Sequence, residues 1–227
     1  SVAQLLLFAQ GSILLEGTYR TPIIWAIAHL VVIGWANMVA MGAMYQLVPV
    51  ALQVPLYSIR LCSFHFVCMV VGLAGLSIGF LTFSSPLLIV SGLVLVLGFF
   101  LFLGNMAYAI SRLRTWNMIA LFVSSALISL ALTILFGFAL IWQLTQGGGL
   151  ASQYHSAMLY THITLGLGAW FSLLIVGFSY KLVPMFTLSH GYSMRLSIPV
   201  FVLLVGGLSL PVLSYFTREH ALFFFGA

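Results

Sequence analysis

Long apolar stretches separated by short polar turns make up almost the whole chain. Each stretch runs for about 20 residues or more, the length that an α-helix needs to cross a hydrocarbon core of roughly 30 Å. The stretches do not alternate polar and apolar residues as the strands of a membrane barrel do. The pattern predicts membrane-spanning helices at residues 22–50, 59–81, 86–112, 115–144, 153–186 and 195–217.

Residues that are typical of turns separate these helices, at 84–86, 147–149 and 189–191. A partial span is expected before residue 16, and residues 221–227 look like the start of a further helix. The expected fold is therefore an all-α polytopic membrane protein with about six to seven transmembrane helices, in a single domain over residues 1–227.

The composition supports the membrane assignment. The 227 residues are 63% hydrophobic and 4% charged, and the mean hydropathy is +1.23, beyond the range of ordinary soluble domains. The net charge of +5 does not indicate a nucleic-acid partner, because the basic residues stand singly or in pairs at the ends of apolar runs. The first residues lack a basic region followed by a cleavage site, so no signal peptide is expected.

Basic residues gather in the turns on one side of the predicted helices. The turns at 84–86 and 146–153, on the other side, carry no charge. Because cytoplasmic loops are enriched in Lys and Arg, the basic turns are expected to be cytoplasmic. The expected location is a bacterial plasma membrane, and the basic residues on the cytoplasmic side are Arg60, Arg112, Arg114, Lys181 and Arg195.

An internal repeat relates two distant parts of the chain. The residues of the first copy recur in the second at a constant offset of 135, which spans four predicted helices. An even number of helices gives both copies the same orientation, so a parallel repeat is predicted, with units at about 22–144 and 153–227, the second incomplete. The matching residues are Gly42, Tyr45, Leu47, Val48 and Pro49 with Gly177, Tyr180, Leu182, Val183 and Pro184.

Two histidines hold equivalent places in the repeated helices. His29 precedes Pro49 by 20 residues and His162 precedes Pro184 by 22, so both are expected about 30 Å from the cytoplasmic ends, near the outer side. Histidines are rare in membrane spans and often functional, although some only bond a neighbouring helix. Two neutral imidazoles are a natural axial pair for a haem iron that transfers single electrons.

Small residues and one more histidine accompany this pair. Ala36 and Ala169 follow the two histidines by seven residues, which in an α-helix returns to the same face and leaves room for a macrocycle edge. Close helix packing explains small residues as well. His155, seven residues before His162, is a candidate for contact with the haem edge, and the alternative is an interfacial histidine without function.

Cys62, His65 and Cys68 have spacings that resemble a metal site. Their side chains drift around one helix and no partner from another segment is evident, so a metal site is not favoured. The two cysteines lie roughly 9 Å apart along the helix axis, too far for a disulfide.

Two stretches resemble the haem-copper oxidase subunit I superfamily, which includes cytochrome oxidases, nitric oxide reductases and NnrS-type proteins. GAMYQLVPVALQVPLYSIRL (42–61), after a span with a histidine, is similar to the family's second transmembrane helix and following loop, and THITLGLGAWFSLLIVGFSYKLVP (161–184) is similar to its tenth helix. The resemblance implies that His29 and His162 ligate a low-spin haem and that Arg218 lies near the haem propionates. The family's pseudo-threefold arrangement of four-helix units fits the repeat.

The chain departs from the family at the oxygen-reducing centre. The family's high-spin haem ligand stands two residues before the low-spin one, where this chain has Tyr160. It also has no adjacent His-His pair and no His-Pro-Glu/Tyr-type segment for the copper site. The resemblance therefore implies a haem-binding relative without that centre.

The sequence favours a membrane b-type cytochrome that holds one or more haem b groups and transfers electrons in a respiratory-type complex. Expected partners are the lipid bilayer, other respiratory subunits, a quinol or cytochrome donor, and a second copy of the chain. The chain is then an oxidoreductase subunit, and whether it is itself an enzyme stays open. The alternatives are a core fragment of a terminal oxidase or nitric oxide reductase, and a haem-free transporter or assembly factor.

Overall fold

The computed structural model of the protein describes residue 4 and residues 21–147, 154–189 and 194–217. The partial span predicted before residue 16, the apolar segment at 221–227 and Arg218 lie outside the described residues.

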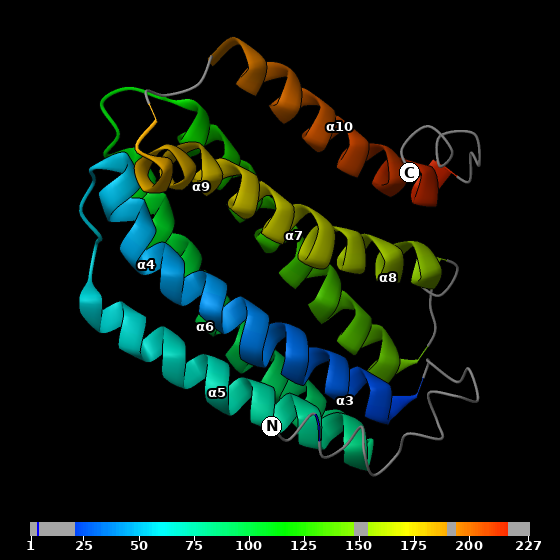
Figure 1. The fold of residues 1–227 in the computed structure, drawn as a ribbon. Helices are drawn as coiled ribbons and strands as arrows, with labels where there is room; N and C mark the ends of the chain where they lie inside the picture. The colour runs from blue at the N-terminus through cyan, green and yellow to red at the C-terminus, as the bar shows by residue number, and fades with distance from the viewer. Residues whose placement is uncertain (1–3, 5–20, 148–153, 190–193, 218–227) are drawn as a thin grey trace. The chain divides into compact units, whose positions relative to one another are not determined.

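Six helices of the described chain are long and apolar enough to cross a membrane (Figure 1). All six predicted spans are confirmed, with ends that agree to within about three residues, and the described residues contain no β-strand. The protein is an all-α polytopic membrane protein. Its helices are α3 (Pro22–Val31), η1 (Val32–Asn37) and α4 (Met38–Leu52), which form one span; α5 (Ile59–Thr82); α6 (Ser85–Ser111); α7 (Met118–Gln146); α8 (His155–Ile163), η3 (Thr164–Ala169) and α9 (Trp170–Thr187), which form another; and α10 (Met194–Thr217).

Specific hydrogen bonds set two of the helix ends. The side chain of Asn117 accepts a hydrogen bond of 2.9 Å from the backbone N–H of Ala120, which caps the start of α7. Phe83 ends α5 in the left-handed conformation, with φ of 53°, and the backbone N–H of Ser84 then donates to the carbonyl of Gly79 at 3.1 Å. This closure lets α6 begin at Ser85, so α5 and α6 form a tight helical hairpin.

Contacts between helices divide the chain into two compact units. Unit 1 comprises residues 1–44 and 58–102, and unit 2 comprises residues 45–57 and 103–227. The predicted repeat of four helices stays a prediction, because this division follows contacts rather than the internal likeness of the sequence.

In unit 1, glycines of α5 allow α6 to approach closely. A Cβ atom added at Gly72, Gly75 or Gly79 would lie 2.7 to 2.9 Å from a side-chain atom of α6. The spacing of three and then four residues places these glycines on one face of α5. Close approach through small residues is how membrane helices gain packing contacts, because lipid supplies no hydrophobic drive between them.

Another face of α5 packs against α3 and η1. A Cβ atom at Gly34 in η1 would lie 2.7 Å from Cδ2 of Leu73. Nearer the other end of α5, the ring of Phe80 contacts both Trp25 and His29 of α3, with centroid distances of 5.8 and 5.3 Å. The histidine-bearing helix of unit 1 is therefore held along its length by α5.

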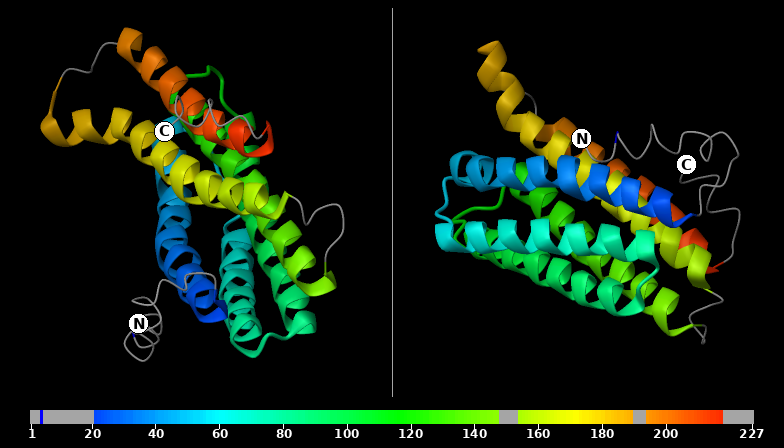
Figure 2. Two further views of the ribbon diagram at one scale, coloured as in Figure 1. Left: turned by 90° about the vertical axis from the view of Figure 1, so that its right-hand side faces the viewer. Right: turned by 90° about the horizontal axis from the view of Figure 1, so that it is seen from below.

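In unit 2, α7 packs against both halves of the span formed by α8, η3 and α9 (Figure 2). Gly177 of α9 lies against Phe122 of α7, and a Cβ atom there would be 2.6 Å from Cβ of Phe122. Gly42, which matches Gly177 in the sequence repeat, has no such neighbour, because nothing lies within 4 Å of its added Cβ. The two copies of the repeated ending therefore pack differently.

Both histidine-bearing spans contain a π-helical turn that the sequence did not predict. The spans were expected to be continuous α-helices, yet η1 and η3 each take up six residues within them. A π turn bonds residue i to i+5 and so takes in about one more residue than an α turn. Residue types do not specify such a turn, which is why hydrophobic periodicity could not reveal it.

Candidate functional site

His29 lies in the last turn of α3 and is held from two sides. Its Nδ1 donates a hydrogen bond of 2.7 Å to the main-chain carbonyl of Trp25, one turn earlier in the same helix. Its ring lies 5.3 Å from the ring of Phe80 on α5, at an interplanar angle of 44°. The side chain is half-buried, so both its position and its orientation are restricted.

His162 lies in the last turn of α8 and is held by the neighbouring helix α7. Its Nδ1 donates a hydrogen bond of 2.9 Å to the main-chain carbonyl of Thr133. The ring packs on Gly137, where an added Cβ atom would lie 2.8 Å from Cε1. His162 is half-buried, like His29.

The two imidazoles share one protonation pattern. A carbonyl oxygen only accepts hydrogen bonds, so the Nδ1 of each neutral ring carries the proton and Nε2 carries the lone pair. Histidines that bind metals are oriented in this way, with the second ring nitrogen donating to a backbone carbonyl or a carboxylate. Each ring, taken by itself, therefore offers the kind of donor that haem iron binds, a neutral imidazole.

The π-helical turns stand at matching places beside the two histidines. η1 begins three residues after His29, and η3 begins two residues after His162. π-helical turns are rare in proteins, and those that occur are often found at functional sites. The matching placement marks both stretches as unlike ordinary packing helices.

Ala36 and Ala169 both fall inside these π-helical turns. Placing them on the same face as the histidines assumed α-helical geometry, and this assumption does not hold across η1 and η3. Ala36 is half-buried and Ala169 is 2% exposed. Their contact with a haem edge stays a prediction.

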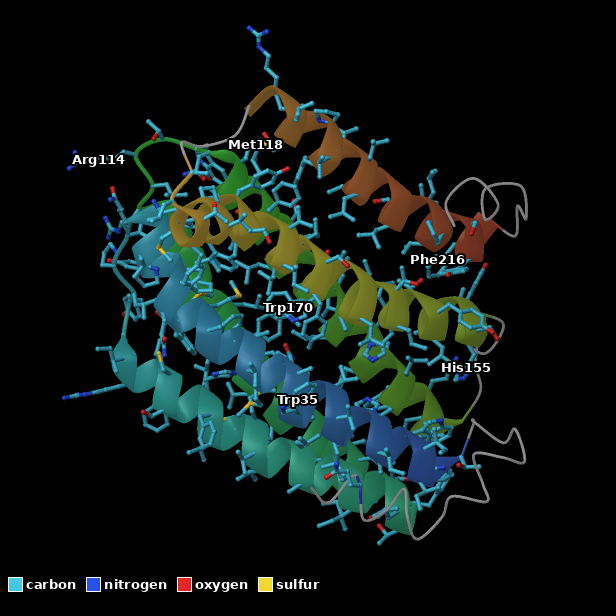
Figure 3. All side chains as sticks on the ribbon, in the orientation of Figure 1. Trp35, Arg114, Met118, His155, Trp170 and Phe216 are labelled. Atoms are coloured by element: carbon cyan, nitrogen blue, oxygen red, sulfur yellow. The ribbon has the colours of Figure 1, made fainter. Side chains whose placement is uncertain are left out.

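His155 is the first residue of α8, at the same end of unit 2 as Phe216 (Figure 3). Its Nδ1 bonds Oε1 of Gln143 at 2.6 Å. This bond links the beginning of α8 to the end of α7. A structural role for His155 is therefore in place, and its predicted contact with haem stays a prediction.

Tyr160 precedes His162 by two residues and packs against α10. Its ring packs against Tyr215 of α10, with a centroid distance of 5.5 Å, and the side chain is 43% exposed. Tyr215 lies 3.5 Å from Oγ1 of Thr164, so these aromatic and hydroxyl groups join α8 and η3 to α10.

Cys62, His65 and Cys68 all lie on α5. Among the residues that the structure describes, no three His, Cys, Asp or Glu side chains gather as metal ligands. Neither of these two cysteines is in a disulfide, and His65 is buried beside the ring of Phe102, with a centroid distance of 5.5 Å.

Sequence reasoning missed several residues around the histidines. Trp25 stands four residues before His29, a spacing that itself signals contact within a helix. Asn37, which is 4% exposed at the end of η1, was overlooked, although a lone amide in an apolar span is a recognisable signal. Thr133 and Gly137 gave no signal, because their contact with His162 joins helices that are distant along the chain.

Comparison of the chain with protein-family models, with curated proteins and with solved structures gave no match. The relationship to the haem-copper oxidases stays a prediction from the two quoted stretches.

Proposed function

We propose that the protein is a polytopic membrane b-type cytochrome in which His29 and His162 are the axial ligands of a haem. The observation that carries the proposal is the shared hydrogen-bond pattern, in which Nδ1 of each ring donates to a main-chain carbonyl. This pattern leaves the lone pair on Nε2 of both rings, the atom by which an imidazole binds iron.

In this proposal, the residues around the two histidines orient the imidazole rings. The carbonyls of Trp25 and Thr133 keep the two rings in the Nδ1–H tautomer and raise the basicity of Nε2. Phe80 and Gly137 restrict the ring planes. When bound, haem supplies one-electron transfer, and its potential responds to the hydrogen bonds of the axial ligands.

The proposal places the haem near the outer side of a bacterial plasma membrane. This placement rests on the basic turns being cytoplasmic and on the distance of both histidines from them along their helices. Electrons come from a quinol or a cytochrome donor and pass to a further respiratory subunit.

Spectroscopy of the purified protein tests the proposal. The wild-type chain is expected to give the reduced-minus-oxidised spectrum of a bis-histidine b-type haem, with haem content measured as the pyridine haemochrome. His29→Ala and His162→Ala should each abolish the spectrum, because a six-coordinate iron loses one ligand. A folded wild-type protein that contains no iron and takes up no added haem would refute the proposal that the chain is a cytochrome.

His65→Ala is the matched control. His65 is also a histidine of a membrane-spanning helix, but it lies on α5 beside Phe102 and is not among the proposed haem-binding residues. This variant should keep its full haem content. A different result would support the haem-free transporter instead. In that case no variant contains haem, and the rate of substrate uptake changes in His29→Ala or His162→Ala.

A further inference from the structure

We infer that Gly137, together with the main-chain carbonyl of Thr133, sets the ring plane and the tautomer of His162. Gly137 is a positioning residue in this view, because a side chain at position 137 displaces the imidazole from the carbonyl. The consequence for haem rests on the proposed function, whereas the positioning of the ring does not.

The distances leave no room for a side chain at position 137. An added Cβ atom would lie 2.8 Å from Cε1, 3.2 Å from Nδ1 and 3.8 Å from Nε2 of His162. All three atoms belong to the imidazole, so the ring lies directly over Gly137. This approach is what brings Nδ1 within 2.9 Å of the Thr133 carbonyl, one helical turn earlier on α7.

Thr133 is itself held in place, so the ring is the part that must give way. Its hydroxyl donates to the carbonyl of Ser129 at 2.8 Å. Its methyl group packs against η3, where a Cβ atom at Gly166 would lie 2.8 Å from Cγ2 of Thr133. A methyl group at position 137 therefore tilts His162 away and lengthens or breaks its hydrogen bond.

The other histidine is oriented by different means. His29 donates to Trp25 of its own helix and needs no glycine on a neighbouring helix. A change at Gly137 should therefore act on His162 and leave His29 unchanged, which makes the inference specific to one ring.

The first test needs no haem. In the full-length chain labelled with ¹⁵N-histidine, ring-nitrogen NMR reports the tautomer of each imidazole, and His162→Ala assigns the resonance. In Gly137→Ala, the ratio of Nδ1–H to Nε2–H tautomer at His162 should fall roughly two- to tenfold, the factor that one ordinary hydrogen bond supplies. Gly104→Ala is the control, because nothing lies within 4 Å of a Cβ atom there, and it should leave the ratio unchanged.

The second test is a double-mutant cycle on stability. If the added methyl group clashes with the imidazole, Gly137→Ala should destabilise the wild-type chain and cost little in the His162→Ala background, where the ring is absent. The same comparison applies if Gly137→Ala alone does not fold, because the double variant should then recover folding. An equal cost in both backgrounds, with an unchanged tautomer ratio, would overturn the inference.

The haem-bound protein gives a third readout. Gly137→Ala should keep haem but shift its midpoint potential and its low-spin electron paramagnetic resonance, because the axial imidazole changes orientation and hydrogen bonding. Gly104→Ala should match the wild type in both. A wild-type chain without haem would end the proposed function, while the tautomer and the double-mutant cycle would still decide the inference.

Discussion

Two imidazoles lie in apolar membrane helices because each has a main-chain acceptor for its N–H. An unpaired polar group in hydrocarbon costs several kcal/mol, so the carbonyls of Trp25 and Thr133 are part of what makes these positions tolerable. The sequence indicated which histidines matter, because a histidine is conspicuous among leucines and valines. Of the two acceptors, only Trp25 lies at a helical spacing from its histidine, so the contact of His162 with α7 could not be predicted.

A buried amide supports the loop between α4 and α5. Asn105 of α6 is 0% exposed, and its Oδ1 accepts a hydrogen bond of 2.9 Å from the backbone N–H of Tyr57. Asn105→Ala removes this acceptor and should lower the free energy of unfolding by about 1–3 kcal/mol, measured by denaturation in mixed micelles. The control is Ser111→Ala, which removes an exposed hydroxyl bonded to Tyr108 and should stay within about 0.5 kcal/mol of wild type. Equal losses in the two variants would contradict this role of Asn105.

At the scale of elements, the π-helical turns are the feature that the sequence did not predict. Hydrophobic periodicity identifies a helix by its apolar face, and spans that are apolar all round carry little of that signal. The extra residue of η1 or η3 therefore leaves no trace in the pattern. Its structural effect is large, because it changes the rotation of a histidine relative to the rest of its span.

Removing one residue from η1 tests this effect. Deletion of Ile33 removes the extra residue that η1 takes in, so a regular α turn should replace the π turn and His29 should keep nearly its direction relative to α4. Deletion of Val39, in the α-helical part of the same span, should instead turn His29 by roughly 100° relative to the rest of α4, since each helical residue contributes that rotation. We expect the Ile33 deletion to retain haem and the Val39 deletion to lower haem content by at least about tenfold, the equivalent of roughly 1.4 kcal/mol of binding free energy, while both chains still insert into the membrane. Equal haem content in the two deletion variants would show that the rotation of His29 does not govern haem binding.

The glycine face of α5 makes a separate prediction. Gly75→Ala places a methyl group 2.8 Å from Cβ of Ser91, so the α5–α6 hairpin must open and the free energy of unfolding should fall by about 1–3 kcal/mol. Gly42→Ala meets no atom within 4 Å and should be neutral or stabilising by up to about 1 kcal/mol, because alanine favours helix. Denaturation of both variants under one condition gives the comparison. A loss in Gly42→Ala as large as in Gly75→Ala would refute the packing argument.

For the whole molecule, span boundaries were predictable because they depend on local residues. The thickness of the bilayer fixes the length of each apolar run, and turn residues mark its ends. Among the helix starts, the predicted and observed positions differ most for α7, which was expected to begin at 115 and begins at Met118. The difference arises because the side chain of Asn117 accepts a hydrogen bond from the backbone N–H of Ala120 and so starts the helix after the apolar Trp116. How the spans contact one another was not predictable, since leucine-rich faces fit many partners.

Orientation across the membrane follows from charge. Arg112 and Arg114 lie in the connection between α6 and α7, and the side chain of each is exposed. The connection between α5 and α6, residues 83 and 84, has no charged residue. Successive spans alternate in direction, so these two connections lie on opposite sides, and the basic one should be cytoplasmic.

Cysteine labelling checks this orientation in intact bacterial cells that express the chain. In a background with Cys62→Ala and Cys68→Ala, Thr82→Cys places a thiol at the exposed end of α5 that is expected to face outward, and Trp116→Cys places one in the connection that is expected to be cytoplasmic, where Trp116 is 60% exposed. A membrane-impermeant maleimide should label the first variant in intact cells and the second only after lysis. Both histidines lie in the first half of their spans, away from the end that is expected to be cytoplasmic. The expected labelling pattern therefore puts the proposed haem toward the outer surface. The reverse pattern would move it to the cytoplasmic side and replace the external donor by a cytoplasmic one.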